Sequence, residues 1–143
     1  TGCLETGASG SAIHRIFTEK LREGRASLLS EKFSRGEEVS LVDILNAVNE
    51  EDVLAIEVVE EIGTVLGRAL AGLINIFNPE LVVIGGDVAT VQEYLLLPVK
   101  SAIQKHSLNI VNKDTSIKFS KLGEKAGPIG ACMLSRSKLL GLM

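Results

Sequence analysis

Asn75-Ile76-Phe77-Asn78-Pro79-Glu80-Leu81-Val82-Val83-Ile84-Gly85-Gly86-Asp87 is the stretch in which a long helical pattern gives way to a strand. Pro79 ends the helix, because proline lacks an N–H group and disfavours helical geometry in the residue before it. The apolar run 81–84 is typical of a strand that is buried on both faces. Gly85 and Gly86 expose bare backbone where this strand ends, and ligands bind beyond such ends in open α/β sheets. Two glycines that only form a tight turn would give the same pattern.

The composition limits what the chain can do. Its 143 residues suffice for one domain or one lobe of a larger one, and 45% hydrophobic with 23% charged residues indicate a globular chain. The formal net charge of −3 argues against binding to a phosphate backbone. We expect no signal peptide and no membrane partner, since no apolar run reaches the roughly 18 residues of a membrane span. Cys3 and Cys132 lie far apart, which favours a reducing cytoplasm over a disulfide framework.

Helical patterns precede the central stretch. Ser9 or Ser11 is expected to cap a first helix, and Gly24 to end it. The segment 25–39 is polar and weakly patterned, which indicates a connector. A capping box at residues 40–43 then predicts a short helix. The chain therefore leads into its longest helix through two shorter ones.

The longest helical pattern runs from about residue 51 to 77, with the acidic residues 50–52 favourably placed in its first turn. Each of the interior glycines Gly63, Gly67 and Gly72 costs about 1 kcal/mol relative to alanine. Three of them predict that another backbone approaches closely, and tolerated surface glycines are the alternative. The expected apolar face comprises Ala55, Val59, Ile62, Leu66, Ala69, Leu70, Leu73 and Phe77.

The remaining elements complete an α/β pattern. A helix is expected over 91–106, where Pro98 should kink it or begin a new turn. Alternation over 115–120 predicts a second strand, and a glycine-rich turn over 122–130 leads into a last helix. This order implies parallel strands joined by a right-handed crossover. Because a two-stranded sheet is marginal and both strands are apolar, we expect the chain to be the C-terminal part of a larger α/β lobe.

Four segments together resemble the ROK family of bacterial sugar-responsive repressors and sugar kinases. Gly2-Cys3-Leu4-Glu5 followed by Ala8-Ser9 is similar to the end of the family's zinc motif, C-x-C-G-x-x-G-C-x-E. Gly67-Arg68-Ala69-Leu70-Ala71 resembles its long helix. Asn78-Pro79-Glu80 through Gly85-Gly86 resembles its N-P-x-x-hydrophobic-G-G strand and turn. Leu122-Gly123-Glu124 with Ala126-Gly127-Pro128-Ile129-Gly130-Ala131 resembles its terminal L-G-x-x-A-G-x-x-G-A. The match spans nearly the whole chain in order and spacing.

The resemblance implies a helix-rich α/β fold with a small parallel sheet, the C-terminal part of an actin-like ATPase (ribonuclease H-like) lobe. Residues 1–143 would be the C-terminal portion of a ROK-type sugar-binding domain, with the other lobe and any DNA-binding domain upstream. The segment 24–29 and the residues through Ser40 look more like NagC/XylR-type repressors than short glucokinases. The implied function is therefore part of the sugar-sensing effector domain of a transcriptional repressor that controls carbohydrate metabolism. The alternative is the C-terminal lobe of an ATP-dependent, glucokinase-like sugar kinase.

The resemblance also implies roles for five residues. Cys3 would be one ligand of a structural zinc site in the intact parent protein, whose other ligands, two Cys and one His, lie upstream. Glu5 would accept hydrogen bonds from sugar hydroxyls, and a solvated glutamate is the alternative. Gly85, Gly86 and Gly127 would lie against the nucleotide of a kinase, or serve turn geometry alone. ATP and Mg²⁺ are implied only for a kinase.

The implied partners follow from the same reasoning. A sugar or sugar phosphate would be the effector, and DNA would be bound only through an upstream domain. A homo-oligomer, in the simplest case a dimer, is expected because the apolar helical faces exceed the sheet that could cover them. For residues 1–143 alone we expect no catalytic residue, no cofactor and no enzymatic activity, because a kinase centre needs phosphate-binding groups, a base and metal ligands together.

Overall fold

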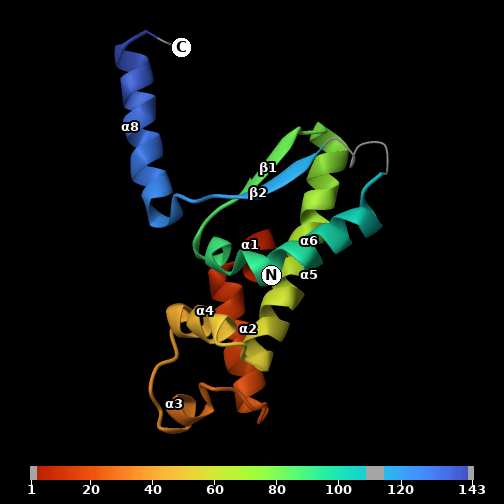
Figure 1. Cartoon of the computed structure of the whole chain (residues 1–143), viewed down its shortest axis with the longest axis vertical. Coiled ribbons are helices and arrows are strands. Elements are labelled where there is room, and N and C mark those ends of the chain that lie inside the picture. The colour runs from red at the N-terminus through yellow and green to blue at the C-terminus, as the bar shows by residue number, and fades with distance from the viewer. Residues whose placement is uncertain (1–2, 109–114, 142–143) are drawn as a thin grey trace.

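The computed structural model describes residues 3–108 and 115–141, most of which are helical (Figure 1). The two strands pair in parallel, with Leu81 opposite Ser116 and Ile84 opposite Phe119. The predicted strand, helix, strand, helix order is confirmed. The elements in chain order are α1 (Leu4–Gly7), α2 (Gly10–Arg22), α3 (Ser30–Ser34), α4 (Leu41–Asn49), α5 (Val53–Phe77), β1 (Leu81–Ile84), η1 (Asp87–Val91), α6 (Gln92–His106), β2 (Ser116–Phe119), η2 (Gly123–Lys125) and α8 (Ala126–Leu139).

The helix starts follow the capping signals in the sequence. Ser9, rather than Ser11, caps α2 by accepting a hydrogen bond from the backbone N–H of Ala12. The capping box of α4 is present between Ser40 and Asp43. The segment 25–39 is not wholly irregular, because it contains the short helix α3. Side-chain acceptors at these positions satisfy backbone N–H groups that have no partner within the helix.

Asp43 gives this capping box a pH dependence. Its carboxylate accepts hydrogen bonds from Lys32 Nζ at 2.8 Å and from the Ser40 backbone N–H at 2.7 Å. The pKa of Asp43 is lowered from 3.8 to about 2, first by Lys32 and then by Ser40. A pKa that is lower in the folded state means that ionised Asp43 stabilises the protein above pH 3.8 and that this contribution is lost as the pH falls through about 2.

We therefore expect Asp43→Asn to lower the free energy of unfolding at neutral pH and to lose that effect in acid. The difference between wild type and variant, measured by urea unfolding at a series of pH values, should shrink as the pH falls from about 4 to about 2. Glu38→Gln, at a carboxylate without an ion pair among the described residues, is the control. A constant difference across this range would contradict the role of Asp43.

One hydrophobic cluster joins the helices. Phe17 of α2, Ile44 of α4, Ile62 of α5 and Leu95 of α6 are fully buried in it. Ile84 at the end of β1 belongs to the same cluster. The predicted apolar face of α5 is confirmed over most of its length. Leu73 and Phe77, however, are exposed near the end of the helix, where no other described element covers them.

The long helix α5 packs most extensively against α6, and glycine makes this possible. A Cβ placed on Gly67 would lie 2.5 Å from the Val99 carbonyl oxygen, and one on Gly63 would lie 3.1 Å from Pro98 Cβ. The predicted close approach is confirmed at these two positions and is wrong at Gly72, which faces open space. The helix α6 contains Pro98 in its interior and does not begin anew there.

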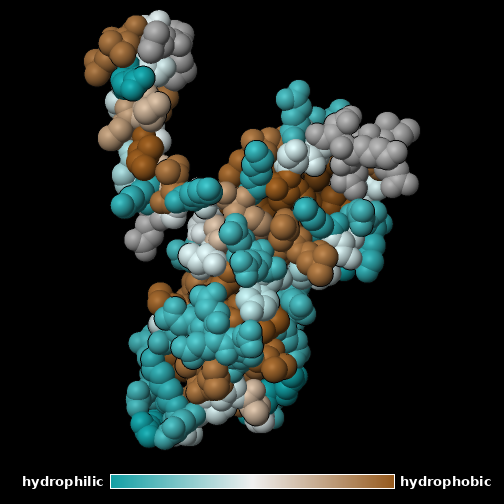
Figure 2. Space-filling view, viewed as in Figure 1, coloured by the Kyte–Doolittle hydropathy of each residue, from teal (hydrophilic) through white to brown (hydrophobic). Residues whose placement is uncertain are grey.

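The prediction that β1 is buried on both faces is wrong for the described residues. Alternate residues of a strand face opposite sides of the sheet. Ile84 and Val82 face the hydrophobic cluster, whereas Leu81 and Val83 are 48% and 56% exposed. Helices cover one face of the sheet, and nothing in residues 3–108 or 115–141 covers the other. Figure 2 accordingly shows hydrophobic surface over the sheet.

The helix α8 extends away from the rest of the molecule (Figure 1). None of its residues is buried, and Figure 2 shows hydrophobic side chains on its surface. The expected last helix is thus present, but its apolar side chains pack against nothing within the described chain. Among the described residues, no helix combines the length and the apolar character needed to cross a membrane.

Candidate functional site

The short helix α1 positions two of the predicted site residues. Cys3 is its N-cap residue and Glu5 lies in its first turn, and both side chains are exposed. Thr6 Oγ1 donates to the Cys3 carbonyl at 2.7 Å, and Ser9 Oγ donates to the Glu5 carbonyl. Arg15 Nη2 also donates to the Thr6 carbonyl at 3.3 Å. The backbone beneath Cys3 and Glu5 is therefore held in place while their side chains project outward.

The Glu5 carboxylate has no ion pair or hydrogen bond to another described residue. It offers acceptor lone pairs on both oxygens, and its place at a helix start is favourable for a negative charge. The helix α1 contacts α2 and α5, where Gly7 lies against Val65. Glu5 is thus an available hydrogen-bond acceptor on a supported segment.

Cys3 does not complete a metal site within the described chain. A structural zinc site needs about four ligands, which are thiolates, imidazoles or carboxylates. Residues 3–108 and 115–141 contain no group of three or more His, Cys, Asp or Glu side chains that could hold a metal ion. Cys3 and Cys132 are exposed free thiols. The described residues alone therefore do not fit zinc.

Gly85 and Gly86 lie at the carboxyl end of β1, as predicted. Gly86 has φ +84° and ψ −173°, a conformation that side-chain-bearing residues essentially do not adopt. The Ser120 N–H donates to the Ile84 carbonyl at 2.8 Å, so the parallel strand β2 ends beside this turn. Both glycines are exposed, and their backbone is open to a ligand approaching this edge of the sheet.

Gly127 lies in a helix and not in the predicted turn. The glycine-rich turn expected over 122–130 is shorter, because η2 is followed directly by α8 from Ala126. Pro128 is compatible with this start, since N–H groups in the first helical turn have no partner within the helix. Because η2 contacts η1, the start of α8 and the Gly85–Gly86 turn lie at the same edge of the molecule. The segments after the two strands are thus linked through the contact of η1 with η2, whereas Glu5 lies on α1, against α2 and α5.

Sequence reasoning missed the ion pairs that join α2 to α5. Lys20 Nζ lies 2.8 Å from Glu57 and 3.1 Å from Glu61, and Arg25 lies 2.6 Å from Glu57. Hydrogen bonding to Arg25 and then Lys20 lowers the pKa of Glu57 to about 2, and Glu57 raises the pKa of Lys20. No sequence pattern links residues more than thirty positions apart, so only the fold reveals this cluster.

Asp52 was expected in the first turn of α5 and is instead its N-cap. Its carboxylate accepts from the Ala55 N–H at 2.8 Å and from the Leu28 N–H at 2.6 Å. It is the one buried charged side chain among the described residues. An Asp directly before an apolar periodic run is a recognised capping signal, so the cap could have been predicted. The bond to Leu28 could not, because the loop that carries it has no regular pattern.

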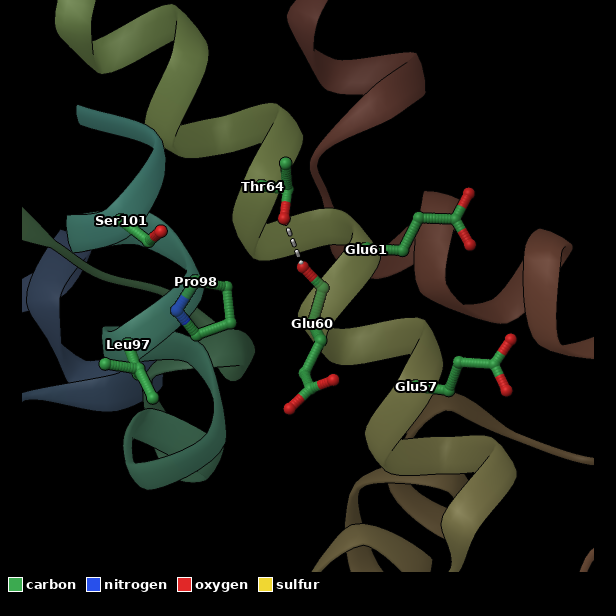
Figure 3. A pocket seen from close by; sticks show the side chains of 7 residues that line it. All are labelled: Glu57, Glu60, Glu61, Thr64, Leu97, Pro98 and Ser101. Atoms are coloured by element: carbon green, nitrogen blue, oxygen red, sulfur yellow. Dashed lines mark hydrogen bonds between the residues drawn. The ribbon is translucent and has the colours of Figure 1, made fainter. Parts of the chain in front are cut away.

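A groove between α5 and α6 is lined by Glu57, Glu60, Glu61, Thr64, Leu97, Pro98 and Ser101 (Figure 3). It continues along the same helices past Arg68, Lys105 and His106. Neither part contains any of the five residues to which a role was assigned from sequence. The groove is therefore separate from the Glu5 segment and from the glycine turn.

Comparison with known proteins shows which proteins the chain resembles. The model of the ROK family matches residues 1–138. A glucokinase of Halalkalibacterium halodurans is 36% identical over 138 residues, which are 96% of this chain and 42% of that protein. The DNA-binding transcriptional dual regulator NagC of Escherichia coli K12 is 30% identical over 142 residues, 99% of this chain and 34% of that protein. The chain thus spans less than half the length of these curated relatives.

A solved structure of a ROK protein has a similar fold. The crystal structure of a ROK family transcriptional regulator, described as a homologue of the E. coli MLC protein, superimposes with a TM-score of 0.75 at 36% identity. The match covers 82% of this chain and 29% of that one. The fold is the actin-like ATPase fold of ROK proteins, helix-rich with a small parallel sheet. From the family match, the identities and the fold, we conclude that this chain belongs to the ROK family.

Proposed function

We propose that the chain forms part of the sugar-sensing effector domain of a ROK transcriptional repressor, with Glu5 as a sugar contact. The observation that carries the proposal is the Glu5 carboxylate, which is exposed and has no partner among the described residues. Its backbone is held in place by the hydrogen bond from Ser9. Membership of the ROK family and similarity to NagC support this function. A carboxylate suits it because it can accept hydrogen bonds from two hydroxyl groups at once.

The mechanism that fits this role is a population shift. A sugar that binds more tightly to one conformation of the protein shifts the equilibrium toward it, by no more than its difference in affinity for the two states. DNA would be contacted by an upstream domain whose presentation depends on that equilibrium. The relevant effector is a sugar or sugar phosphate, and structural zinc would require ligands for Cys3 from outside the described residues. Two exposed free cysteines fit a reducing, cytoplasmic setting.

A sugar kinase is the second candidate, and two observations favour it. The similarity to the H. halodurans glucokinase is 36% over nearly the whole chain. The exposed turn at Gly85 and Gly86, at the carboxyl edge of the sheet, leaves backbone open to a nucleotide phosphate. ATP and Mg²⁺ would be needed for this activity. The base and the phosphate-binding loop would lie in the remainder of such a protein.

Replacing Glu5 tests the proposed sugar contact. The test uses the full-length protein that contains this chain and whichever of glucose or N-acetylglucosamine the wild type binds. Glu5→Ala should weaken the binding of that sugar by about tenfold or more. Hydrogen bonds to a charged group contribute roughly 1.5–3 kcal/mol, and 1.4 kcal/mol corresponds to a factor of ten. The measurement is isothermal titration, together with sugar-dependent release of operator DNA. DNA binding without sugar should be unchanged.

Glu38→Ala, at an exposed glutamate that like Glu5 has no ion pair among the described residues, is the matched control and should leave the sugar titration unchanged. An unaltered sugar dose-response in Glu5→Ala would refute the role of Glu5. Phosphorylation of the sugar by the wild-type protein in the presence of ATP and Mg²⁺ would instead select the kinase. The two candidate functions thus give different results in one set of assays.

A further inference from the structure

The helix α1, which carries Glu5, is too short to hold its own conformation. It comprises the four residues Leu4–Gly7, and none of them is buried. Isolated helices of fewer than about 12 residues are marginal in water, and burial of side chains adds little support here. The direction in which Glu5 projects therefore depends on the polar contacts that hold the backbone of α1.

Two side chains donate hydrogen bonds to the carbonyl groups at the end of α1. Ser9 Oγ donates to the Glu5 carbonyl, and Arg15 Nη2 donates to the Thr6 carbonyl at 3.3 Å. Carbonyls at a helix end have no partner within the helix, so both bonds fill vacant acceptors. Ser9 belongs to the turn directly after α1, and its bond is local. Arg15 lies nine residues from Thr6 and ties α1 to the interior of α2.

Arg15 is itself held in a defined orientation. Its Nη1 donates to both carboxylate oxygens of Glu19, at 3.2 and 3.1 Å, one turn further along α2. The guanidinium group is planar and presents its N–H groups in a fixed fork. Binding to Glu19 through Nη1 therefore leaves Nη2 for the Thr6 carbonyl. The helix α2 is a firm support, because Ile13 and Phe17 on its other face are fully buried.

The bridge formed by Arg15 adds little to the stability of the whole protein. The side chains of Arg15 and Glu19 are 52% and 50% exposed, and exposed ion pairs contribute little to the free energy of unfolding. Removing Arg15 should therefore leave the hydrophobic core intact. The part of the molecule that depends on this bridge is α1, and Glu5 directly precedes the bonded residue Thr6.

We propose that Arg15 is a positioning residue for Glu5, which it serves by fastening α1 to α2 so that the Glu5 carboxylate is in place before a sugar binds. This inference rests on the proposed sugar contact of Glu5. Arg15 acts through the backbone of α1 and does not touch the sugar. A segment that is already ordered loses less conformational entropy on binding, so the affinity for the sugar depends on how firmly α1 is held.

Arg15→Ala tests this role in the full-length protein, with glucose or N-acetylglucosamine, whichever the wild type binds. The variant should bind that sugar about three- to tenfold more weakly, because α1 must then become ordered during binding. The amide hydrogens of residues 4–8 should also exchange faster with solvent, while those of α5 stay protected. Isothermal titration measures the first effect, and hydrogen exchange followed by mass spectrometry measures the second.

Two further variants sharpen the result. Arg22→Ala removes an exposed arginine of the same helix that has no ion pair among the described residues, and it should change neither readout. Arg15→Lys keeps the charge but lacks the planar fork that bridges Glu19 and Thr6. It should therefore weaken sugar binding as Arg15→Ala does, and it replaces that variant if alanine impairs folding. Full affinity in Arg15→Lys would overturn the proposal, because charge alone would then suffice.

A double-mutant cycle separates positioning from an independent effect. Adding Arg15→Ala to Glu5→Ala should not weaken sugar binding further, because no carboxylate remains to be positioned. Losses that add would overturn the proposal, since Arg15 would then act independently of Glu5. Unchanged sugar binding in Arg15→Ala, with weakened binding in Glu5→Ala, would overturn it and leave the proposed function standing. Unchanged binding in Glu5→Ala would refute the sugar contact and the positioning role together.

Discussion

Gly67→Ala is expected to destabilise the protein by about 2–4 kcal/mol, above the usual effect of a single substitution. The new methyl group would lie 2.5 Å from the Val99 carbonyl oxygen, 2.8 Å from Ala102 Cβ and 2.9 Å from Val99 Cα. Backbone atoms of α6 cannot rotate away as a flexible side chain can. The two helices would have to separate, which would disturb the buried contacts of Leu95, Val99 and Ile103.

Gly72→Ala is the matched control on the same helix. A Cβ at this position meets nothing within 4 Å, so alanine adds helix propensity without a clash. Its expected effect is a stabilisation of about 0.5–1 kcal/mol. Urea unfolding followed by far-UV circular dichroism measures both variants. Equal effects of the two substitutions would show that helix propensity, and not the approach of α6, governs this position.

Asp52→Ala is expected to lower the free energy of unfolding by about 2–4 kcal/mol. It removes the N-cap of α5 and also leaves the Leu28 N–H without its acceptor at 2.6 Å. The Ala55 N–H bond is buried, and a buried donor without a partner pays its full desolvation cost, whereas the bond to the Leu28 N–H is partly buried. Because α5 contributes the largest share of the hydrophobic core, fraying at its start affects the contacts of α2 and α4 as well.

Asp52→Asn separates the two bonds of this carboxylate. The amide oxygen can still accept from Ala55, whereas the NH₂ group would face the N–H of Leu28, donor against donor. The loss should therefore fall between those of the wild type and Asp52→Ala. Thermal unfolding of the three proteins checks this order. A loss for Asp52→Asn as large as for Asp52→Ala would assign the whole effect to the bond between Asp52 and Leu28, because Asn keeps the cap of α5.

Local rules predicted the elements of the fold well. The cap at Ser9, one of the two candidates, the capping box at residues 40–43 and the end of α5 before Pro79 all depend on neighbouring residues, which the sequence displays directly. The parallel pairing of β1 with β2 also follows from element order. Where the prediction was wrong, the cause was tertiary. Whether Val83 or Gly72 is covered depends on what other elements lie against it.

The candidate site was predictable only in part. The Gly85–Gly86 turn lies at the sheet edge as expected, because the position of a loop after a strand is a local property. Gly127 lies in a helix because the start of α8 is set by competition between turn and helix over a few residues. The groove of α5 and α6 was not predicted at all. Its charged residues, such as Glu60 and Lys105, line one groove only because the two helices lie side by side in the folded structure.

The extended position of α8 determines how its amide hydrogens exchange with solvent. A helix without buried residues gains no stability from packing, and an isolated helix of this length is marginal in water. Gly127 and Gly130 weaken it further. Its amide hydrogens should therefore exchange with solvent through local fraying, at rates close to those of an unstructured peptide. The amide hydrogens in the buried part of α5 should exchange only when the hydrophobic core unfolds. The chain thus contains a cooperative core and a terminal segment whose folding is nearly uncoupled from it.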